Sequence, residues 1–208
     1  MVIDYSKGAI CVVLLDFGGV MAEEGFREGL MAIARSNGIS ADKFFEFAAQ
    51  SVYGSGYVVG GCTEAEYWAR LREQAGIRGE DEKLRQELLD RFILRPWAVE
   101  LVRKMRRKGT VVALLSDQTN WLDELNERDD FCKEFDHVFN SYHLGKGKRD
   151  PSLFDDVAEL LAVEPSRAVF VDDSPDHIER ARSRGFNAIL YRDKEDLLAE
   201  LRKLGLAL

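Results

Sequence analysis

Val12-Val13-Leu14-Leu15-Asp16-Phe17-Gly18-Gly19-Val20 is an apolar run that stops abruptly at a carboxylate and two glycines. A short apolar run bounded by turn residues is typical of a strand that is buried on both faces, as in a parallel sheet. Asp16 then lies at the carboxyl end of the strand, where open α/β sheets bind their ligands. A carboxylate at this place can act as a nucleophile or hold a metal ion. This stretch alone leaves open the alternative of a loop aspartate that caps a turn.

The rest of the chain predicts an α/β fold around this strand. Five strands are predicted, over residues 10–16, 110–115, 137–140, 168–171 and 187–191. Amphipathic helical patterns separate the later strands, and such alternation predicts right-handed crossovers and a parallel sheet between two layers of helices. We therefore expect a three-layer Rossmann-like fold.

A long helical segment interrupts this alternation after the first strand. Apolar residues recur at helical spacing up to about Phe92, and Thr63 precedes Glu66 at the spacing of a capping box. No strand is predicted within this segment, and a glycine-rich link over 53–61 divides it in two. We expect residues 1–22 and 94–208 to form the core and residues 23–93 to form an inserted helical domain.

Composition excludes several functional classes. Hydrophobic residues make up 46% and charged residues 32% of the 208-residue chain, which favours a folded globular protein over a disordered one. A net charge of −8 with only short basic runs argues against nucleic acid as a partner. No apolar run approaches the length of about 20 residues that spans a bilayer. Three scattered cysteines without a signal peptide predict reduced thiols in a cytoplasmic protein. We expect a monomer or a homodimer.

Polar residues of one kind follow three of the predicted strands. Asp16, Ser116 and the pair Asp172-Asp173 stand at strand ends, and Lys148 lies in a loop before a helix. Because the carboxyl ends of parallel strands share one edge of a sheet, we expect these side chains to converge. Three close carboxylates repel one another unless a cation joins them, and Mg²⁺ prefers such oxygen ligands together with a phosphate. This set predicts phosphoryl-transfer chemistry.

With these residues in place, the chain resembles the haloacid dehalogenase-like hydrolase superfamily over nearly its whole length. Four segments carry the resemblance: LLDFGGV (14–20), ALLSD (113–117), GKGKRDPSLF (145–154) and VFVDDSPDHIERA (169–181), of which the last is the most specific. The inserted helices resemble the cap of the family. GGCTEAEYW (60–68) resembles a segment of caps in the subgroup near epoxide hydrolase amino-terminal domains and sugar phosphatases.

The resemblance implies a Mg²⁺-dependent phosphatase that acts on a small phosphorylated metabolite. Asp16 is implied to attack the phosphoryl group, and water then hydrolyses the aspartyl-phosphate. Ser116 and Lys148 are implied to take part in catalysis, and both are implied to bind the substrate together with Asp117. The third segment selects Lys148 over Lys146. The cap is implied to close over the substrate and to supply specificity.

A metal site is implied as well. Its ligands are Asp16, the backbone carbonyl of Gly18, and Asp173, with Asp172 nearby or also coordinating. Gly18 departs from the pattern, since phosphatases of the family usually carry a second aspartate there as general acid and base.

Three groups are candidates to replace this missing aspartate: Glu23, Glu24 and Asp117. Two other functions stay open. A metal-independent 2-haloacid dehalogenase also lacks the second aspartate, because halide leaves without a proton. A catalytically weak protein that binds a phosphorylated ligand can keep the same fold.

Overall fold

Five short strands form one parallel sheet in the order β3-β2-β1-β4-β5. The structure is a computed structural model that describes residues 9–208. Its strands are β1 (Val12–Leu15), β2 (Val111–Ser116), β3 (His137–Asn140), β4 (Ala168–Asp172) and β5 (Asn187–Leu190). The predicted strands and the α/β fold are thus confirmed. β1 is central and places Leu15 between Leu114 of β2 and Val171 of β4, so these three strands end side by side.

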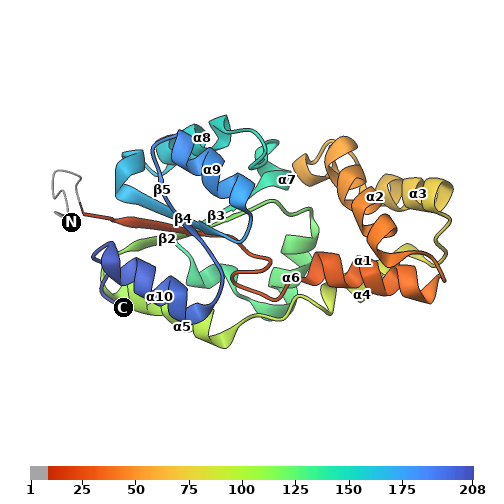
Figure 1. Cartoon of the computed structure of the whole chain (residues 1–208), viewed down its shortest axis with the longest axis horizontal. Helices are drawn as coiled ribbons and strands as arrows, with labels where there is room; N and C mark the ends of the chain where they lie inside the picture. Colours follow the sequence, from red (N-terminus) through yellow and green to blue (C-terminus); the bar gives the residue numbers. More distant parts are fainter. Residues whose placement is uncertain (1–8) are drawn as a thin grey trace.

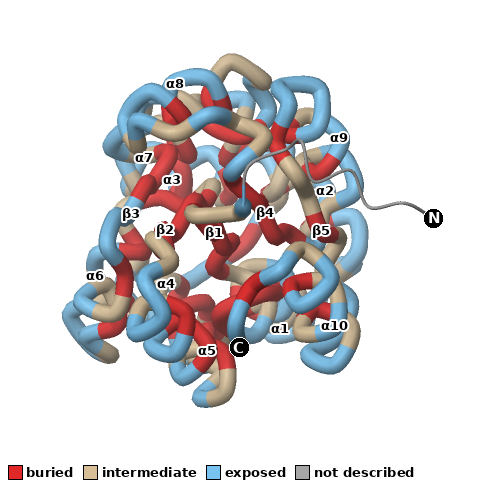
Figure 2. The backbone as a smooth tube through the Cα atoms, turned by 90° about the vertical axis from the view of Figure 1, so that its left-hand side faces the viewer, coloured by how far each residue is buried: buried red, intermediate tan, exposed pale blue. Residues whose placement is uncertain are grey.

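Successive side chains of the strands pack alternately into two hydrophobic cores, because neighbouring residues of a strand point to opposite faces of the sheet. Val13 and Leu15 belong to the larger core, and Val12 and Leu14 belong to the smaller one. Helices α8 (Ser152–Leu160) and α9 (Pro175–Ser183) cover the smaller core. The larger core lies under α5 (Pro96–Arg107), α6 (Trp121–Asp129) and α10 (Lys194–Lys203). Figures 1 and 2 show the buried strands between these two layers of helices.

A helical insert separates β1 from β2 and stands beside the sheet (Figure 1). It contains α1 (Gly25–Ser36), α2 (Ala41–Gly54), α3 (Glu64–Ala75) and α4 (Asp81–Leu89). The capping box that Thr63 and Glu66 predict is present at the start of α3. Part of the predicted glycine-rich link is helical, because α2 runs to Gly54 and residues Tyr57–Val59 form a 3-10 turn whose Tyr57 and Val58 are buried. An isolated antiparallel bridge joins Ala22 to Leu94 at the base of the insert.

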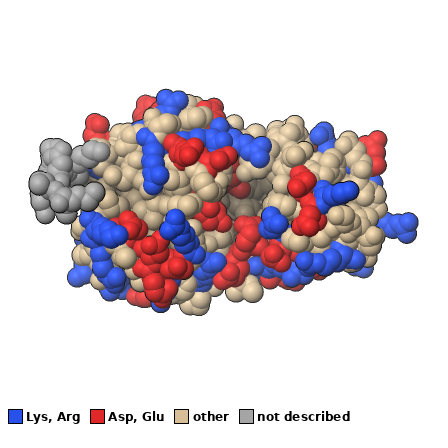
Figure 3. Space-filling model, in the orientation of Figure 1, with Lys and Arg blue, Asp and Glu red and all other residues tan. Residues whose placement is uncertain are grey.

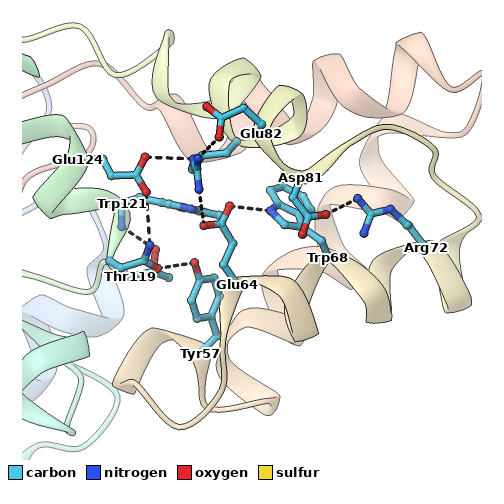
Figure 4. Close-up of polar contacts among 11 residues, drawn as sticks. Tyr57, Glu64, Trp68, Arg72, Asp81, Glu82, Thr119, Trp121 and Glu124 are labelled. Atoms are coloured by element: carbon cyan, nitrogen blue, oxygen red, sulfur yellow. Dashed lines mark hydrogen bonds and ion pairs between the residues drawn. The ribbon is translucent and has the colours of Figure 1, made fainter.

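Polar contacts seat the insert on the core. The Arg85 guanidinium lies 3.0 Å from Glu64 within the insert and 3.0 Å from Glu124 of α6. Figure 4 labels Glu64 and Glu124 and draws these polar contacts as dashed lines. The Tyr57 hydroxyl donates a hydrogen bond of 2.6 Å to Asn120, just before α6. These contacts fix the insert over the carboxyl ends of the strands. Within residues 9–208, no helix has the length and apolar character that a membrane crossing requires.

Candidate active site

Asp16 and Ser116 meet at the ends of two adjacent strands. Asp16 follows β1 directly, and its backbone N–H donates to the carbonyl of Val171, which extends the pairing with β4. Ser116 is the last residue of β2, and its hydroxyl donates a hydrogen bond of 3.0 Å to Asp16 Oδ1. Parallel pairing in register thus brings together two residues that lie 100 positions apart in the chain.

Lys148 is buried between two carboxylates. Its side chain is 1% exposed, and its Nζ lies 2.6 Å from Asp16 Oδ1 and 2.7 Å from Asp172 Oδ2. The backbone N–H of Lys148 donates to Asp117 Oδ1 at 2.8 Å, which anchors the loop to the end of β2. Burial lowers the pKa of Lys148, but the charges of Asp16 and Asp172 outweigh burial and raise the pKa above its ordinary value. Lys148 is therefore a permanent cation at the centre of the site.

The carboxylates around Lys148 differ in their protonation. Burial raises the pKa of Asp16 to about 7, with a further rise from Asp172, although Lys148 opposes the shift. Burial also acts to raise the pKa of Asp172, but Lys148 and His177 outweigh it and lower the pKa to about 2. Asp172 Oδ1 accepts from the backbone N–H of Ser174 at 2.8 Å and lies 3.2 Å from His177 Nδ1. The anionic partner that best neutralises Lys148 is therefore Asp172.

Asp173 completes a cluster of three carboxylates. One oxygen of each of Asp16, Asp172 and Asp173 can be chosen so that all three lie within 4.8 Å of one another. Burial and the neighbouring Asp172 raise the pKa of Asp173. Gly19 has a φ of 78°, and a Cβ there would lie 2.2 Å from Asp173 Oδ2, so the turn after β1 approaches Asp173 as only glycine allows. The donor set fits a hard divalent cation such as Mg²⁺, because the oxygens are close and one lysine does not balance three carboxylates.

A cavity of about 170 Å³ opens above these residues, between the core and the insert. Figure 3 shows this face of the molecule hollowed between the two parts. Asp16, Gly18, Ser116, Lys148 and Asp173 line its floor. The insert contributes further lining residues, which are Glu24, Phe26, Val52, Tyr53 and Val58. A substrate in this cavity contacts both parts of the chain.

The three candidates for the missing aspartate lie in different surroundings. Glu23 is exposed and forms an ion pair of 2.9 Å with Arg95, whose hydrogen bond lowers the pKa of Glu23. Asp117 lines the cavity, but its carboxylate already accepts from Lys148 and from the Tyr53 hydroxyl at 3.3 Å. Glu24 lines the cavity, and burial raises its pKa. Of these three residues, Glu24 alone lines the cavity and has a carboxylate oxygen, Oε2, that accepts no hydrogen bond from residues 9–208.

Several lining residues were not predicted from the sequence. Tyr53 lies near the end of α2. Gln118, Thr119 and Trp121 lie around the start of α6, a helix that was not among those expected from the sequence. Gln118 and Thr119 are buried polar residues directly after Ser116-Asp117. Their proximity to a predicted strand end is the one signal that points to them. The direction of the Tyr53 side chain depends on how the insert packs.

The fold and this site define a Rossmann-like α/β protein with a buried aspartate-lysine centre. The family model of haloacid dehalogenase-like hydrolases matches residues 12–185, and the chain therefore belongs to this family. The sequence is 29% identical over 126 residues to bifunctional epoxide hydrolase 2 of Rattus norvegicus, which covers 57% of this chain and 22% of the relative. This chain thus spans about a fifth of the length of that relative. Phosphatase MT3486 of Mycobacterium tuberculosis is 26% identical, with 64% of each chain covered.

Solved structures share the fold. A HAD family enzyme of Bacteroides thetaiotaomicron, crystallised with magnesium and inorganic phosphate, superposes with a TM-score of 0.71 at 22% identity, covering 91% of this chain and 99% of that one. An L-2-haloacid dehalogenase of Xanthobacter autotrophicus superposes with a TM-score of 0.65 at 18% identity, covering 95% and 84%. At these identities the likeness establishes the fold, and the chemistry has to be argued from the site.

Proposed function

We propose that this hydrolase is a Mg²⁺-dependent phosphatase that acts on a small phosphorylated metabolite through an aspartyl-phosphate. The observation that carries the proposal is Lys148, a buried cation held between Asp16 and Asp172 beside a third carboxylate, Asp173. This arrangement concentrates both signs of charge at the floor of the cavity, as phosphoryl transfer requires. The phosphatase among the relatives and the neighbouring structure with magnesium and phosphate support the same conclusion.

Each residue at the floor of the cavity has a role in this reaction. Asp16 is the nucleophile, and one of its oxygens attacks phosphorus while the bond from phosphorus to the leaving group breaks. Ser116 donates a hydrogen bond to a phosphoryl oxygen, and Lys148 stabilises negative charge on the phosphoryl group. Asp117 holds the backbone of Lys148 and thereby positions the lysine against the substrate. Water then attacks the phosphorus of the aspartyl-phosphate and restores Asp16.

Asp16, the backbone carbonyl of Gly18, Asp172 and Asp173 would hold Mg²⁺. The close approach of three carboxylates is the observation that fits a divalent ion. When bound, Mg²⁺ neutralises the phosphoryl oxygens and the nucleophile so that two anions can meet. Asp172 contributes charge to this cluster while it fixes Lys148 and His177.

We propose that residues 23–93 form a cap domain and that residues 1–22 and 94–208 form the catalytic core. The bridge between Ala22 and Leu94 lies where this division places the two connections. Val52, Tyr53 and Val58 of the proposed cap line the cavity, so they contact the part of the substrate beyond its phosphate. We expect substrate choice to depend on these side chains. A cytoplasmic location and a monomeric or homodimeric state stay predictions from the sequence.

A 2-haloacid dehalogenase is the second candidate, and Gly18 favours it. Such an enzyme needs no proton for its leaving group and uses no metal. The cluster of Asp16, Asp172 and Asp173 disfavours it, because a haloacid brings no cation to offset three carboxylates. A protein that binds a phosphorylated ligand without turnover is the third candidate.

Phosphate release from a panel of sugar phosphates and acyl phosphates, with and without Mg²⁺, tests the proposal. We expect release that depends on Mg²⁺, that Asp16→Asn abolishes, and that the control Asp176→Asn leaves intact, because Asp176 is exposed on α9. Halide release from 2-chloropropionate without metal would contradict the proposal in favour of a dehalogenase. Absence of both activities, with Mg²⁺ still raising the melting temperature, would support the binding protein instead.

A further inference from the structure

Gly18 occupies the position where phosphatases of the family usually carry a second aspartate, but another carboxylate, that of Glu24, lies beside it. Gly18 lines the cavity, and it is not among the glycines with positive φ, so its backbone accepts other residues. A Cβ built on Gly18 lies 3.4 Å from Glu24 Oε2, 3.4 Å from the Phe92 ring and 4.0 Å from Gln118 Nε2. The Glu24 carboxylate thus occupies the space into which a side chain from position 18 would extend.

Local structure fixes Glu24 in this place. Glu24 is the N-cap of α1, and its Oε1 accepts a hydrogen bond of 3.0 Å from the backbone N–H of Arg27. Its other oxygen, Oε2, has no hydrogen-bond partner among residues 9–208 and faces the cavity side near Gly18. Capping holds one oxygen and leaves the other available to a ligand.

The neighbouring carboxylates are committed elsewhere. Glu23 points to Arg95, and both of its oxygens accept from that guanidinium at 3.0 and 2.9 Å. Asp117 accepts from the Lys148 backbone and from Tyr53. Of the carboxylates that line the cavity, Asp16 and Asp173 belong to the floor, which leaves Glu24 to face the leaving group.

We propose that Glu24, at the start of the cap, is the general acid and base of the reaction and replaces the side chain that is absent at Gly18. The inference rests on the proposed phosphatase function. In the first step Asp16 forms its bond to phosphorus, the bond to the leaving oxygen breaks, and the protonated Glu24 gives its proton to that oxygen. In the second step a water molecule forms the new bond to phosphorus, its proton passes to the Glu24 carboxylate, and the Asp16 carboxylate departs. Inorganic phosphate leaves, and both side chains return to their starting states.

The test compares leaving groups rather than overall activity. The Glu24→Gln variant retains an oxygen that can cap α1, so we expect it to fold. With Mg²⁺ present, we expect kcat/KM for an alkyl phosphate such as glycerol phosphate to fall by about 10²- to 10⁴-fold, the usual contribution of general acid catalysis. For p-nitrophenyl phosphate and acetyl phosphate, whose leaving groups need no proton, we expect kcat/KM to change by less than about threefold. The matched control Glu23→Gln should keep wild-type values for all three substrates.

Two further readouts separate catalysis from a structural effect. Because the second step then lacks its base, Glu24→Gln should show a burst of p-nitrophenol followed by a slower steady state. The double variant Gly18→Asp with Glu24→Ala, which frees the space beside position 18, should regain alkyl phosphate hydrolysis relative to Glu24→Ala.

An equal loss for all leaving groups would overturn the assignment, and so would an unchanged kcat/KM for the alkyl phosphate. Either result in an enzyme whose wild type still releases phosphate through Asp16 would leave the phosphatase function standing. A wild type without any phosphate release would instead remove the proposed function itself.

Discussion

Replacement of Lys148 by methionine is expected to destabilise the fold strongly, because Lys148 is the cation that holds two buried carboxylates together. The side chain is 1% exposed, and it pairs with Asp16 at 2.6 Å and with Asp172 at 2.7 Å. Removing one partner of a buried ion pair typically costs about 3–5 kcal/mol, since the other charge stays buried without compensation. Here two carboxylates lose the same partner, so we expect Lys148→Met to reach that range at pH 8 in the absence of Mg²⁺.

The loss should depend on pH in a defined direction. Without Lys148, the pKa of Asp16 rises further above its value of about 7. A carboxyl whose folded-state pKa exceeds its unfolded-state pKa stabilises the fold at low pH and loses this contribution as the pH rises through the folded-state pKa. Above pH 7 the wild type has already lost most of this contribution, whereas the variant, with its higher pKa for Asp16, continues to lose it. We expect the difference in unfolding free energy between the two proteins to be larger at pH 8 than at pH 6.

Urea unfolding followed by tryptophan fluorescence measures the effect. Lys146→Met is the matched control, because Lys146 lies in the same loop but pairs with Asp156 at the surface. We expect its unfolding midpoint to stay near the wild-type value. A Lys148→Met midpoint equal to that of the control would refute the reasoning.

Three further predictions follow from the site and its supports. Because Asp16 binds a proton with a pKa of about 7 when metal is absent, Mg²⁺ should bind about tenfold more weakly at pH 6 than at pH 8, as titration calorimetry would measure. Gly19→Ala should cost about 1–2 kcal/mol in unfolding free energy and reduce the rise in melting temperature with Mg²⁺, because its Cβ would displace Asp173. Arg85→Met should lower the unfolding free energy by about 1 kcal/mol in urea titrations, since the partly exposed guanidinium joins the insert to Glu124.

Controls and contrary results are available for each of these. Gly38→Ala imposes the same kind of backbone strain at a φ of 68° with no neighbour within 4 Å, so it should leave the Mg²⁺ response unchanged. A Gly19→Ala variant with a full response would show that the turn does not position Asp173. An affinity for Mg²⁺ that is the same at both pH values would exclude Asp16 from the ligands. If Arg85→Met also changed Mg²⁺ affinity, the ion pair would have a role beyond stability.

The floor of the site could be predicted because it depends on strands alone. Asp16, Ser116 and Asp172 each come directly after or at the end of an apolar run, and parallel pairing carries such residues to one edge. The choice of Lys148 over Lys146 came from the resemblance to the family. The two lysines have different surroundings in the structure. Lys146 pairs with Asp156 at the surface, whereas Lys148 is buried and pairs with Asp16.

The lining residues that lie in the insert and around the start of α6 could not be predicted from the sequence. Tyr53 belongs to the predicted glycine-rich link over residues 53–61, but in the structure it lies in α2, and only the packing of the insert directs its side chain into the cavity. Helix α6 was not predicted, since Trp121, Leu122 and Leu125 form a short pattern after a polar loop. Glu23 and Glu24 are adjacent and alike in the sequence. Arg95, which lies far along the chain, forms an ion pair with Glu23, whereas Glu24 lines the cavity.

Trapping the intermediate on Asp16 tests the central claim most directly. Rapid acid quenching of the protein with acetyl phosphate, followed by peptide mass spectrometry, would locate any phosphoryl group. We predict a phosphoryl adduct on the peptide that contains Asp16, formed with Mg²⁺, absent after chelation and absent in Asp16→Asn. Mg²⁺-dependent phosphate release with no adduct on Asp16 at any quench time, or with an adduct on another residue, would contradict the account.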